Sequence, residues 1–179
     1  MIGVLVSGEG TNLQALLDEA LPVVAVASNT AEARALGRAE AAGVATAAFA
    51  LEDFETREER DLAMADWLDE QGARVIACAG YMQLLTPAFL ARFPNRIVNL
   101  HPSLLPAFPG TSPIEDALRA GAAETGVTVH WVDEGVDSGP IIAQERFAIL
   151  PGDTADTLHE RVHDVEHRLF PRVLRGLVA

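Results

Sequence analysis

Hydrophobic and polar positions divide the chain into two kinds of segment that alternate. Short apolar runs predict buried strands at residues 2–7, 22–28, 44–49, 74–79 and 96–100. Segments of mixed polarity between them predict helices at 11–20, 31–42 and 53–71, with short helices within 82–93. The apolar runs are mostly continuous, as is typical of strands that helices cover on both faces. The alternation therefore predicts a parallel sheet with right-handed crossovers.

The pattern changes after residue 110. A helix is expected at 114–122, followed by strands at 125–132 and 140–149 that the acidic loop 133–139 joins into an antiparallel hairpin. Asp153 is expected to cap a last helix that runs to about residue 177. We find no linker and no internal repeat, so we expect residues 1–179 to form a single domain. The predicted class is α/β, with a Rossmann-like, mostly parallel open sheet, helices on both faces and an antiparallel C-terminal hairpin.

The charge balance excludes several classes of partner. The 179 residues include 26 acidic and 13 basic side chains, all of the latter Arg, for a formal net charge of −13. This balance argues against broad binding to nucleic acid or to an anionic membrane. No apolar segment is long enough to span a bilayer, and the N-terminus lacks a signal-peptide pattern. We expect a cytoplasmic protein in which the single Cys78 is a core residue.

A glycine turn follows the first predicted strand, at the edge where open α/β sheets bind ligands. Its sequence is Gly8-Glu9-Gly10-Thr11-Asn12. It lacks the third glycine of the dinucleotide fingerprint and the Lys of a P-loop. The N-terminus of the following helix favours an anion, and a small monophosphate fits better than a triphosphate. A tight turn without a ligand is the alternative.

A second candidate site is the end of the strand at 96–100, where the sequence is "NLHPSLLP". Asn99 and His101 are two residues apart, so their side chains point to the same face of an extended strand. Asp137, in the loop "DEGVDSGP", would hold the tautomer of His101 if its carboxylate reached the ring. A polar strand end and a solvated loop are the alternatives. For His130, within an alternating strand, we expect a structural, hydrogen-bonded role.

The stretch "HERVH" at 159–163 matches the H-E-x-x-H pattern of zinc proteases. His159 and His163 would share one helix face, with His167 one turn further on. A suitably spaced third ligand is missing in the sequence, so we predict that the match is a coincidence and that the protein uses no metal.

Taken together, these stretches resemble the glycinamide ribonucleotide formyltransferase family, which uses folate in purine synthesis. The resemblance covers essentially the whole chain, through "LVSGEGTNLQALLD", "ASN", "AGYMQLLTPAFL", "RIVNLHPSLLPAFPG", "GVTVHWVDEGVDSGPII" and "EH" in the last helix. It implies transfer of a formyl group from the cosubstrate 10-formyltetrahydrofolate to the amine of glycinamide ribonucleotide, without a metal. Both partners are small molecules, and the resemblance leaves the protein a monomer or a homodimer.

The resemblance also assigns roles to individual residues. It implies that the catalytic residues are Asn99, His101 and Asp137. It implies ribonucleotide binding by Gly10, Thr11, Asn12 and Glu166. It implies folate binding by Arg57, Met82, Gln83, Leu84, Leu85 and Asn99. It further implies a cis peptide bond between Leu105 and Pro106.

Several positions depart from the family pattern. Glu9, Thr30 and Gln83 stand where neutral or basic residues are frequent, and the segment 111–116 lacks the usual histidines.

Formyltetrahydrofolate hydrolase or another folate-dependent formyltransferase is the alternative function. The hydrolase normally has an N-terminal regulatory domain, whereas the first strand here is expected at residue 2. Methionyl-tRNA formyltransferase normally has a C-terminal domain and a basic surface. An inactive folate- or nucleotide-binding protein would not need the intact set Asn99, His101 and Asp137.

Overall fold

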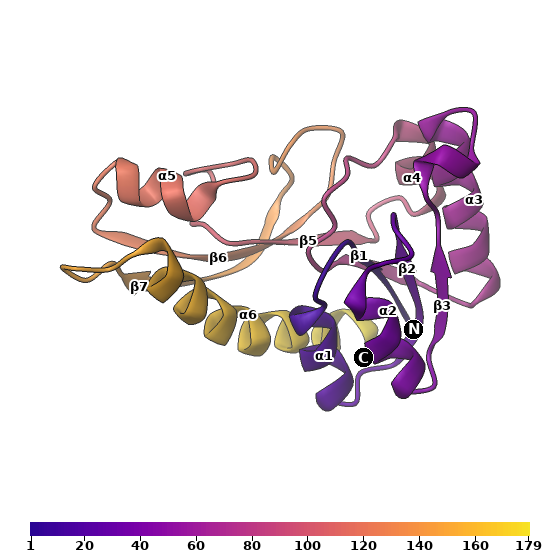
Figure 1. The fold of residues 1–179 in the computed structure, drawn as a ribbon, viewed down its shortest axis with the longest axis horizontal. Coiled ribbons are helices and arrows are strands. Elements are labelled where there is room, and N and C mark those ends of the chain that lie inside the picture. The colour runs from indigo at the N-terminus through magenta and orange to yellow at the C-terminus, as the bar shows by residue number, and fades with distance from the viewer.

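Seven strands form one open sheet in the computed structural model, which describes all 179 residues (Figure 1). The strands are β1 (Ile2–Val6), β2 (Val23–Ser28), β3 (Ala45–Ala48), β4 (Val75–Cys78), β5 (Ile97–His101), β6 (Glu124–Trp131) and β7 (Ile141–Ala148). Their order across the sheet is β3-β2-β1-β4-β5-β6-β7. The first five strands pair in parallel, whereas β6 and β7 add in antiparallel fashion. The predicted fold class is therefore confirmed.

Helices cover both faces of this sheet. They are α1 (Thr11–Asp18), α2 (Arg34–Ala41), α3 (Arg57–Glu70), α4 (Pro87–Arg92), α5 (Pro113–Arg119) and α6 (Ala155–Val178), with a 3-10 turn at Leu51–Asp53. Helices α1, α2, α5 and α6 supply residues to one core, and α3 and α4 supply residues to the other. In Figure 1, α6 runs along the sheet from the β6–β7 end back towards α1. No helix is long and apolar enough to cross a membrane.

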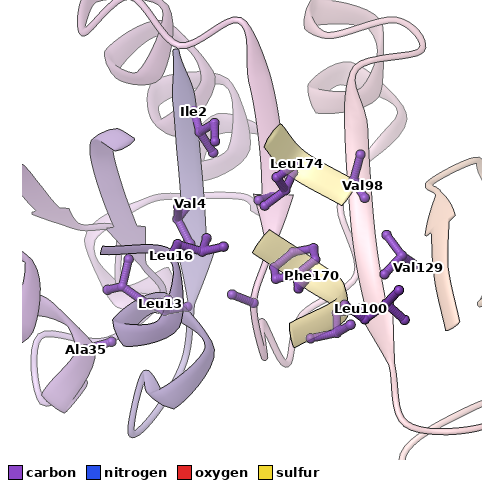
Figure 2. Close-up of a cluster of buried hydrophobic side chains, with 14 of the residues drawn as sticks. Ile2, Val4, Leu13, Leu16, Ala35, Val98, Leu100, Val129, Phe170 and Leu174 are labelled. Carbon is purple, nitrogen blue, oxygen red and sulfur yellow. The ribbon is translucent and has the colours of Figure 1, made fainter. Parts of the chain in front are cut away.

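The strands alternate between two buried faces, which explains their continuous apolar sequences. In β1, Ile2 and Val4 belong to the core beneath α6, while Leu5 belongs to the core beneath α3. Figure 2 shows Phe170 and Leu174 of α6 among side chains of the central strands. Because both faces exclude water, the carboxyl edge of the sheet is where polar side chains can gather.

Several predicted boundaries were wrong, and hydrogen bonds explain three of them. The helix expected at 53–71 begins at Arg57, because the Thr56 side chain caps it by accepting from Glu59 N. Thr154, rather than Asp153, caps α6. The segment 82–85 is not helical: Met82 N donates to Ser7 Oγ, and Arg57 donates to the carbonyl of Leu84. Such bonds to distant segments compete with helix formation.

Two local features shape the loops beside β5 and β6. The Leu105–Pro106 peptide bond is cis, as the resemblance implied. Gly139 begins the return from the loop 132–140 into β7, where a Cβ atom would lie 1.8 Å from Trp131 O. Only glycine permits this close approach of two backbone segments.

Candidate active site

Asn99 and His101 occupy the end of β5 and project from the face opposite to Val98 and Leu100. In the antiparallel pairing with β6, Asn99 lies opposite His130 and His101 lies opposite Thr128. His101 is 4% exposed, whereas Asn99 is half-buried. The strand pairing thus brings an amide, two imidazoles and a hydroxyl to one place.

Asp137 enters this group from the loop between β6 and β7. Its Oδ2 lies 3.5 Å from His101 Nδ1 and accepts from Gly110 N at 2.9 Å. Its Oδ1 accepts from Asn99 Nδ2 at 3.4 Å. Burial by itself raises the pKa of Asp137, but the His130 ring, the Gly110 N–H and the neighbouring His101 together hold it below the ordinary value. Asp137 is therefore a carboxylate at neutral pH.

The ring of His101 is held from both sides. Its Nε2 lies 2.9 Å from the carbonyl oxygen of Phe108. Since a carbonyl only accepts, Nε2 carries a proton and Nδ1 faces Asp137. An ion pair with Asp137 forms when Nδ1 is protonated as well. The ring is thus held in one orientation, with Nδ1 directed at the Asp137 carboxylate.

His130 is a member of the cluster that the sequence reasoning did not find. Its Nδ1 lies 2.8 Å from Trp131 O, and its Nε2 lies 3.2 Å from Asn99 Nδ2. It is buried and hydrogen-bonded, as expected, but its Nε2 also lies 3.7 Å from Asp137 Oδ1. Only the register of β6 against β5 places it beside Asn99, and the sequence alone does not give that register.

Thr128 ties the loop after β5 to the sheet. Its hydroxyl donates to Ser103 O at 2.6 Å and accepts from Leu105 N at 3.1 Å. Gln144 of β7 donates to both the Thr128 hydroxyl and the carbonyl of Leu105. This network holds the loop that carries Phe108 and Gly110, and so positions the partners of His101 and Asp137.

Two adjoining pockets meet at these residues. One pocket lies between the segments 81–85 and 132–137, and the other runs beside 99–102 and 110–113. Asn99 and Asp137 line both pockets, together with Tyr81, Gln83, Leu84 and Val136. Two ligands could therefore meet at Asn99 and Asp137.

The residues predicted to bind folate form one wall of this cleft. Gln83, Leu84 and Leu85 line the first pocket, and Met82 lines the second. Arg57 Nη2 donates to Leu84 O at 2.6 Å, which anchors the wall to α3. Met82 is 70% exposed and Leu84 is also exposed, so an apolar surface faces the solvent here.

The glycine turn adopts the geometry of a helix N-terminus with unpaired N–H groups. Gly10 has φ 73°, and a Cβ there would lie 2.5 Å from the Cβ of Ala35. Asn12 Nδ2 donates to Glu166 Oε2 at 3.1 Å, and this hydrogen bond links two of the residues predicted to bind the ribonucleotide. The turn and Glu166 therefore lie side by side although 154 residues separate Asn12 from Glu166.

The charge of Glu9 within this turn is balanced by α2. Glu9 Oε2 lies 3.0 Å from Arg34 Nη1, and both side chains are exposed. Arg38 Nε donates to the carbonyl of Glu9 at 2.8 Å. Two arginines therefore flank a turn in which the sequence suggested an excess of negative charge.

The "HERVH" histidines lie along α6 away from the cluster at β5. His159 lies 3.6 Å from Glu115 of α5, while His163 bonds to Glu166. No group of three or more His, Cys, Asp or Glu side chains is arranged to hold a metal ion.

Comparison with known proteins gives consistent matches. Residues 1–174 match the model of the formyl transferase family. A phosphoribosylglycinamide formyltransferase of Haemophilus influenzae is 39% identical over 97% of this chain and 85% of its own length. A trifunctional purine biosynthetic protein of Drosophila pseudoobscura pseudoobscura is 43% identical over 99% of this chain, which spans 14% of that longer protein.

Solved structures agree in fold. The phosphoribosylglycinamide formyltransferase of Streptococcus pneumoniae superposes with a TM-score of 0.96 and is 42% identical, with 99% of this chain and 98% of that chain covered. A glycinamide ribonucleotide transformylase of Symbiobacterium toebii gives a TM-score of 0.95 at 44% identity, with 97% and 85% covered.

Proposed function

The chain belongs to the formyl transferase family, and we propose that it transfers the formyl group of 10-formyltetrahydrofolate to the amine of glycinamide ribonucleotide. This reaction is a step of purine biosynthesis. The observation that carries the proposal is the cluster of Asn99, His101 and Asp137 at the junction of two pockets. A transfer between two bound molecules needs such a junction, with donors directed at the reacting carbon.

The chemistry follows from the groups present. The neutral amine attacks the formyl carbon, and its carbonyl oxygen becomes an oxyanion in the tetrahedral intermediate. Asn99 supplies one amide N–H to that oxygen by giving up its long, 3.4 Å bond to Asp137, and His101 supplies positive charge when Nδ1 is protonated. The bond from the formyl carbon to the folate nitrogen then breaks, the nitrogen takes up a proton, and the amine loses one. His101 assists this proton movement, and Asp137 orients and charges its ring.

The two substrates bind at different places, the folate in the cleft and the ribonucleotide phosphate at the glycine turn. The pterin of the folate lies between the segments 81–85 and 132–137, where Leu84 and Leu85 give an apolar wall. The phosphate of the ribonucleotide binds the N–H groups at Gly10, Thr11 and Asn12. Glu166, beside Asn12, contacts the same substrate.

An absorbance assay that follows loss of the formyl group from 10-formyltetrahydrofolate tests this function directly. We expect turnover only when glycinamide ribonucleotide is present, with one formylated product formed for each folate consumed. Turnover with water alone would identify a hydrolase. Turnover with methionyl-tRNA but not with the ribonucleotide would identify the other formyltransferase and would overturn the proposal.

A further inference from the structure

One acidic residue of α3 lies where the helix pattern predicts an apolar side chain. The buried positions of this helix include Asp61, Met64, Ala65 and Leu68, which have the i, i+3, i+4 and i+7 spacing of a single face. The last three belong to the core beneath the helix, whereas Asp61 places an acidic group there at 0% exposure. A buried charge costs free energy unless it is paired, so we expect a specific reason for Asp61 at this position.

Arg60 compensates the charge of Asp61 on one side of the carboxylate. Its Nε and Nη2 donate to Asp61 Oδ1 at 2.9 Å and 2.6 Å, and Arg60 is itself 1% exposed. Buried ion pairs of this kind are weak sources of stability, because the desolvation of both charges offsets their attraction. Stability alone therefore does not account for the pair.

The other oxygen of the carboxylate holds the chain at the end of the segment 81–85, which forms one wall of the cleft. Asp61 Oδ2 accepts from Thr86 N at 2.8 Å. Thr86 directly follows this segment, and its side chain caps α4 by accepting from Phe89 N. Asp61 thus fixes the point at which the wall ends and α4 begins.

Asp61 acts together with Arg57, which lies one helical turn earlier on α3. Arg57 Nη2 donates to Leu84 O, and Asp61 accepts from Thr86 N. Four helical residues rise about 6 Å, and two residues of non-helical chain span at most about 7 Å. The two anchors on the helix therefore match two backbone groups of the wall, and together they hold residues 84–86 against α3.

The first residue of the wall lies beside the same ion pair. The side chain of Tyr81 packs against the core that contains Met64. Burial raises the pKa of the Tyr81 hydroxyl most, while the charge of Arg60 lowers it and the charge of Asp61 raises it. Both ends of the segment 81–85 are therefore close to Arg60 and Asp61.

We propose that Asp61 is a positioning residue for the formyl donor: paired with Arg60, it holds the backbone at Thr86 so that the segment 81–85 keeps the shape that binds the folate. This inference rests on the proposed function, which places the folate against this segment. Asp61 is fully buried and acts through that backbone rather than on the ligand. Loss of the anchor should therefore weaken folate binding and leave the reaction itself nearly unchanged, because other segments hold the polar cluster at the end of β5.

The double variant Arg60→Met/Asp61→Leu tests the proposal without leaving a buried charge unpaired. Replacement of a buried ion pair by apolar side chains of similar volume is often neutral or stabilising. We expect a thermal midpoint within about 5 °C of the wild type, and a KM for 10-formyltetrahydrofolate that is about tenfold higher. Both kcat and the KM for glycinamide ribonucleotide should stay within about twofold. Loss of folate affinity without loss of stability is a result that a purely structural role would not give.

A second pair of variants removes the same hydrogen bond from the side of its donor. Thr86 has φ −73° and ψ 156°, which proline can adopt, so Thr86→Pro deletes the N–H with little backbone strain. Thr86→Ala is the matched control, because both variants lose the side chain that caps α4 and only the alanine keeps the N–H. We expect the KM for the folate to be about five- to tenfold higher in Thr86→Pro than in Thr86→Ala. This pair decides the question if the double variant at 60–61 does not fold.

A second ion pair, between α3 and α4, provides a control for general loosening of the helix. Asp66 of α3 pairs with Arg92 of α4, and water reaches both side chains. The variant Asp66→Asn/Arg92→Gln weakens the contact between the two helices and leaves the bond from Thr86 N to Asp61 in place. We expect its KM for the folate to stay within about twofold of the wild type.

The contrary results differ in meaning. A wild-type KM for the folate in Arg60→Met/Asp61→Leu, or equal values in Thr86→Pro and Thr86→Ala, would overturn the proposal. An equal rise in Asp66→Asn/Arg92→Gln would show that loosening of α3, rather than loss of Asp61, changes folate binding. If the wild type shows no turnover with 10-formyltetrahydrofolate and glycinamide ribonucleotide, the proposed function fails. Calorimetric titration of 10-formyltetrahydrofolate alone then decides the role of Asp61, which fails too if the wild type does not bind or if the variants bind equally well.

Discussion

The polar cluster at the end of β5 and the wall at 81–85 border the same cleft but are held very differently. Hydrogen bonds join Asn99 to Asp137 and to β6. Further hydrogen bonds join His101 and Asp137 to the loop after β5. The wall is held at Met82 N and at Leu84 O, while the side chains of Met82 and Leu84 are exposed.

This difference matches the tasks that the two regions would have. Groups that stabilise charge during the reaction act best when they are fixed in advance, because they then need no reorganisation. A wall that binds an apolar ring gains its affinity when the ligand covers it, so it is exposed beforehand. We therefore expect changes in the cluster to reduce kcat and changes at the wall to raise one KM.

The largest effect is expected for Asp137→Asn. The substitution keeps the size of the side chain but removes the charge that pairs with His101. We expect kcat to fall about 100- to 1000-fold, comparable with the loss of one oxyanion donor at about 3 kcal/mol. Both KM values should stay within a few-fold, since the lost interaction belongs to the transition state. Steady-state kinetics with each substrate varied in turn checks this. A rise in KM without a fall in kcat would show that Asp137 is not a catalytic residue.

A smaller, selective effect is expected for Arg57→Met. This change removes the hydrogen bond from the Arg57 guanidinium to Leu84 O, which anchors the wall to α3. We expect the KM for the folate to rise about tenfold, in line with loss of a charged hydrogen bond at an exposed site. The KM for the ribonucleotide should not change.

Arg57→Lys is the matched control, because it keeps the charge and can keep one donor. It should fall between the wild type and Arg57→Met. Equal increases in both KM values for Arg57→Met would show that the wall also shapes the ribonucleotide site, and the comparison of the two regions would no longer hold.

A slight effect is expected for Glu9→Gln in the glycine turn. The pair with Arg34 already balances the charge of Glu9, and both side chains are exposed. We expect ribonucleotide binding to tighten by about two- to threefold, as Arg34 becomes free to act on the phosphate. The double variant Glu9→Gln/Arg34→Gln should return close to the wild-type affinity. Weaker binding in Glu9→Gln would show that the Glu9–Arg34 pair holds the turn in shape.

No effect is expected on removal of metal ions. No group of three or more His, Cys, Asp or Glu side chains is arranged to hold a metal ion, and the proposed mechanism uses only side chains of the protein. Exhaustive dialysis against a strong chelator should leave kcat unchanged. Loss of activity that added zinc restores would place a metal in the reaction.

Much of the fold was predictable because its signals are local. The continuous apolar runs identified the parallel strands, and strand periodicity placed Asn99 and His101 on one face. The tertiary network around the loops was not predictable. The amides of Met82 and Thr86 donate to Ser7 and Asp61, which lie far away in sequence, so a local pattern could not exclude a helix there.

The partners of the site residues likewise depend on the register between strands. His130 joins Asn99 only because β6 pairs with β5 at that position, and a shift of one residue would turn it to the other face. The Glu9–Arg34 pair depends on how α2 packs against the turn. Resemblance to a family suggested the residues of the site, but the ion pairs that surround them depend on how the elements pack.

The central claim is that His101 and Asp137 act as one unit, and a double-mutant cycle on kcat tests it most directly. The four proteins are the wild type, His101→Asn, Asp137→Asn and the double variant, assayed with saturating folate and ribonucleotide. Because Asp137 is proposed to work through the His101 ring, the double variant should be little slower than His101→Asn alone. If the two losses in activation free energy simply add, the residues act independently and the account is contradicted.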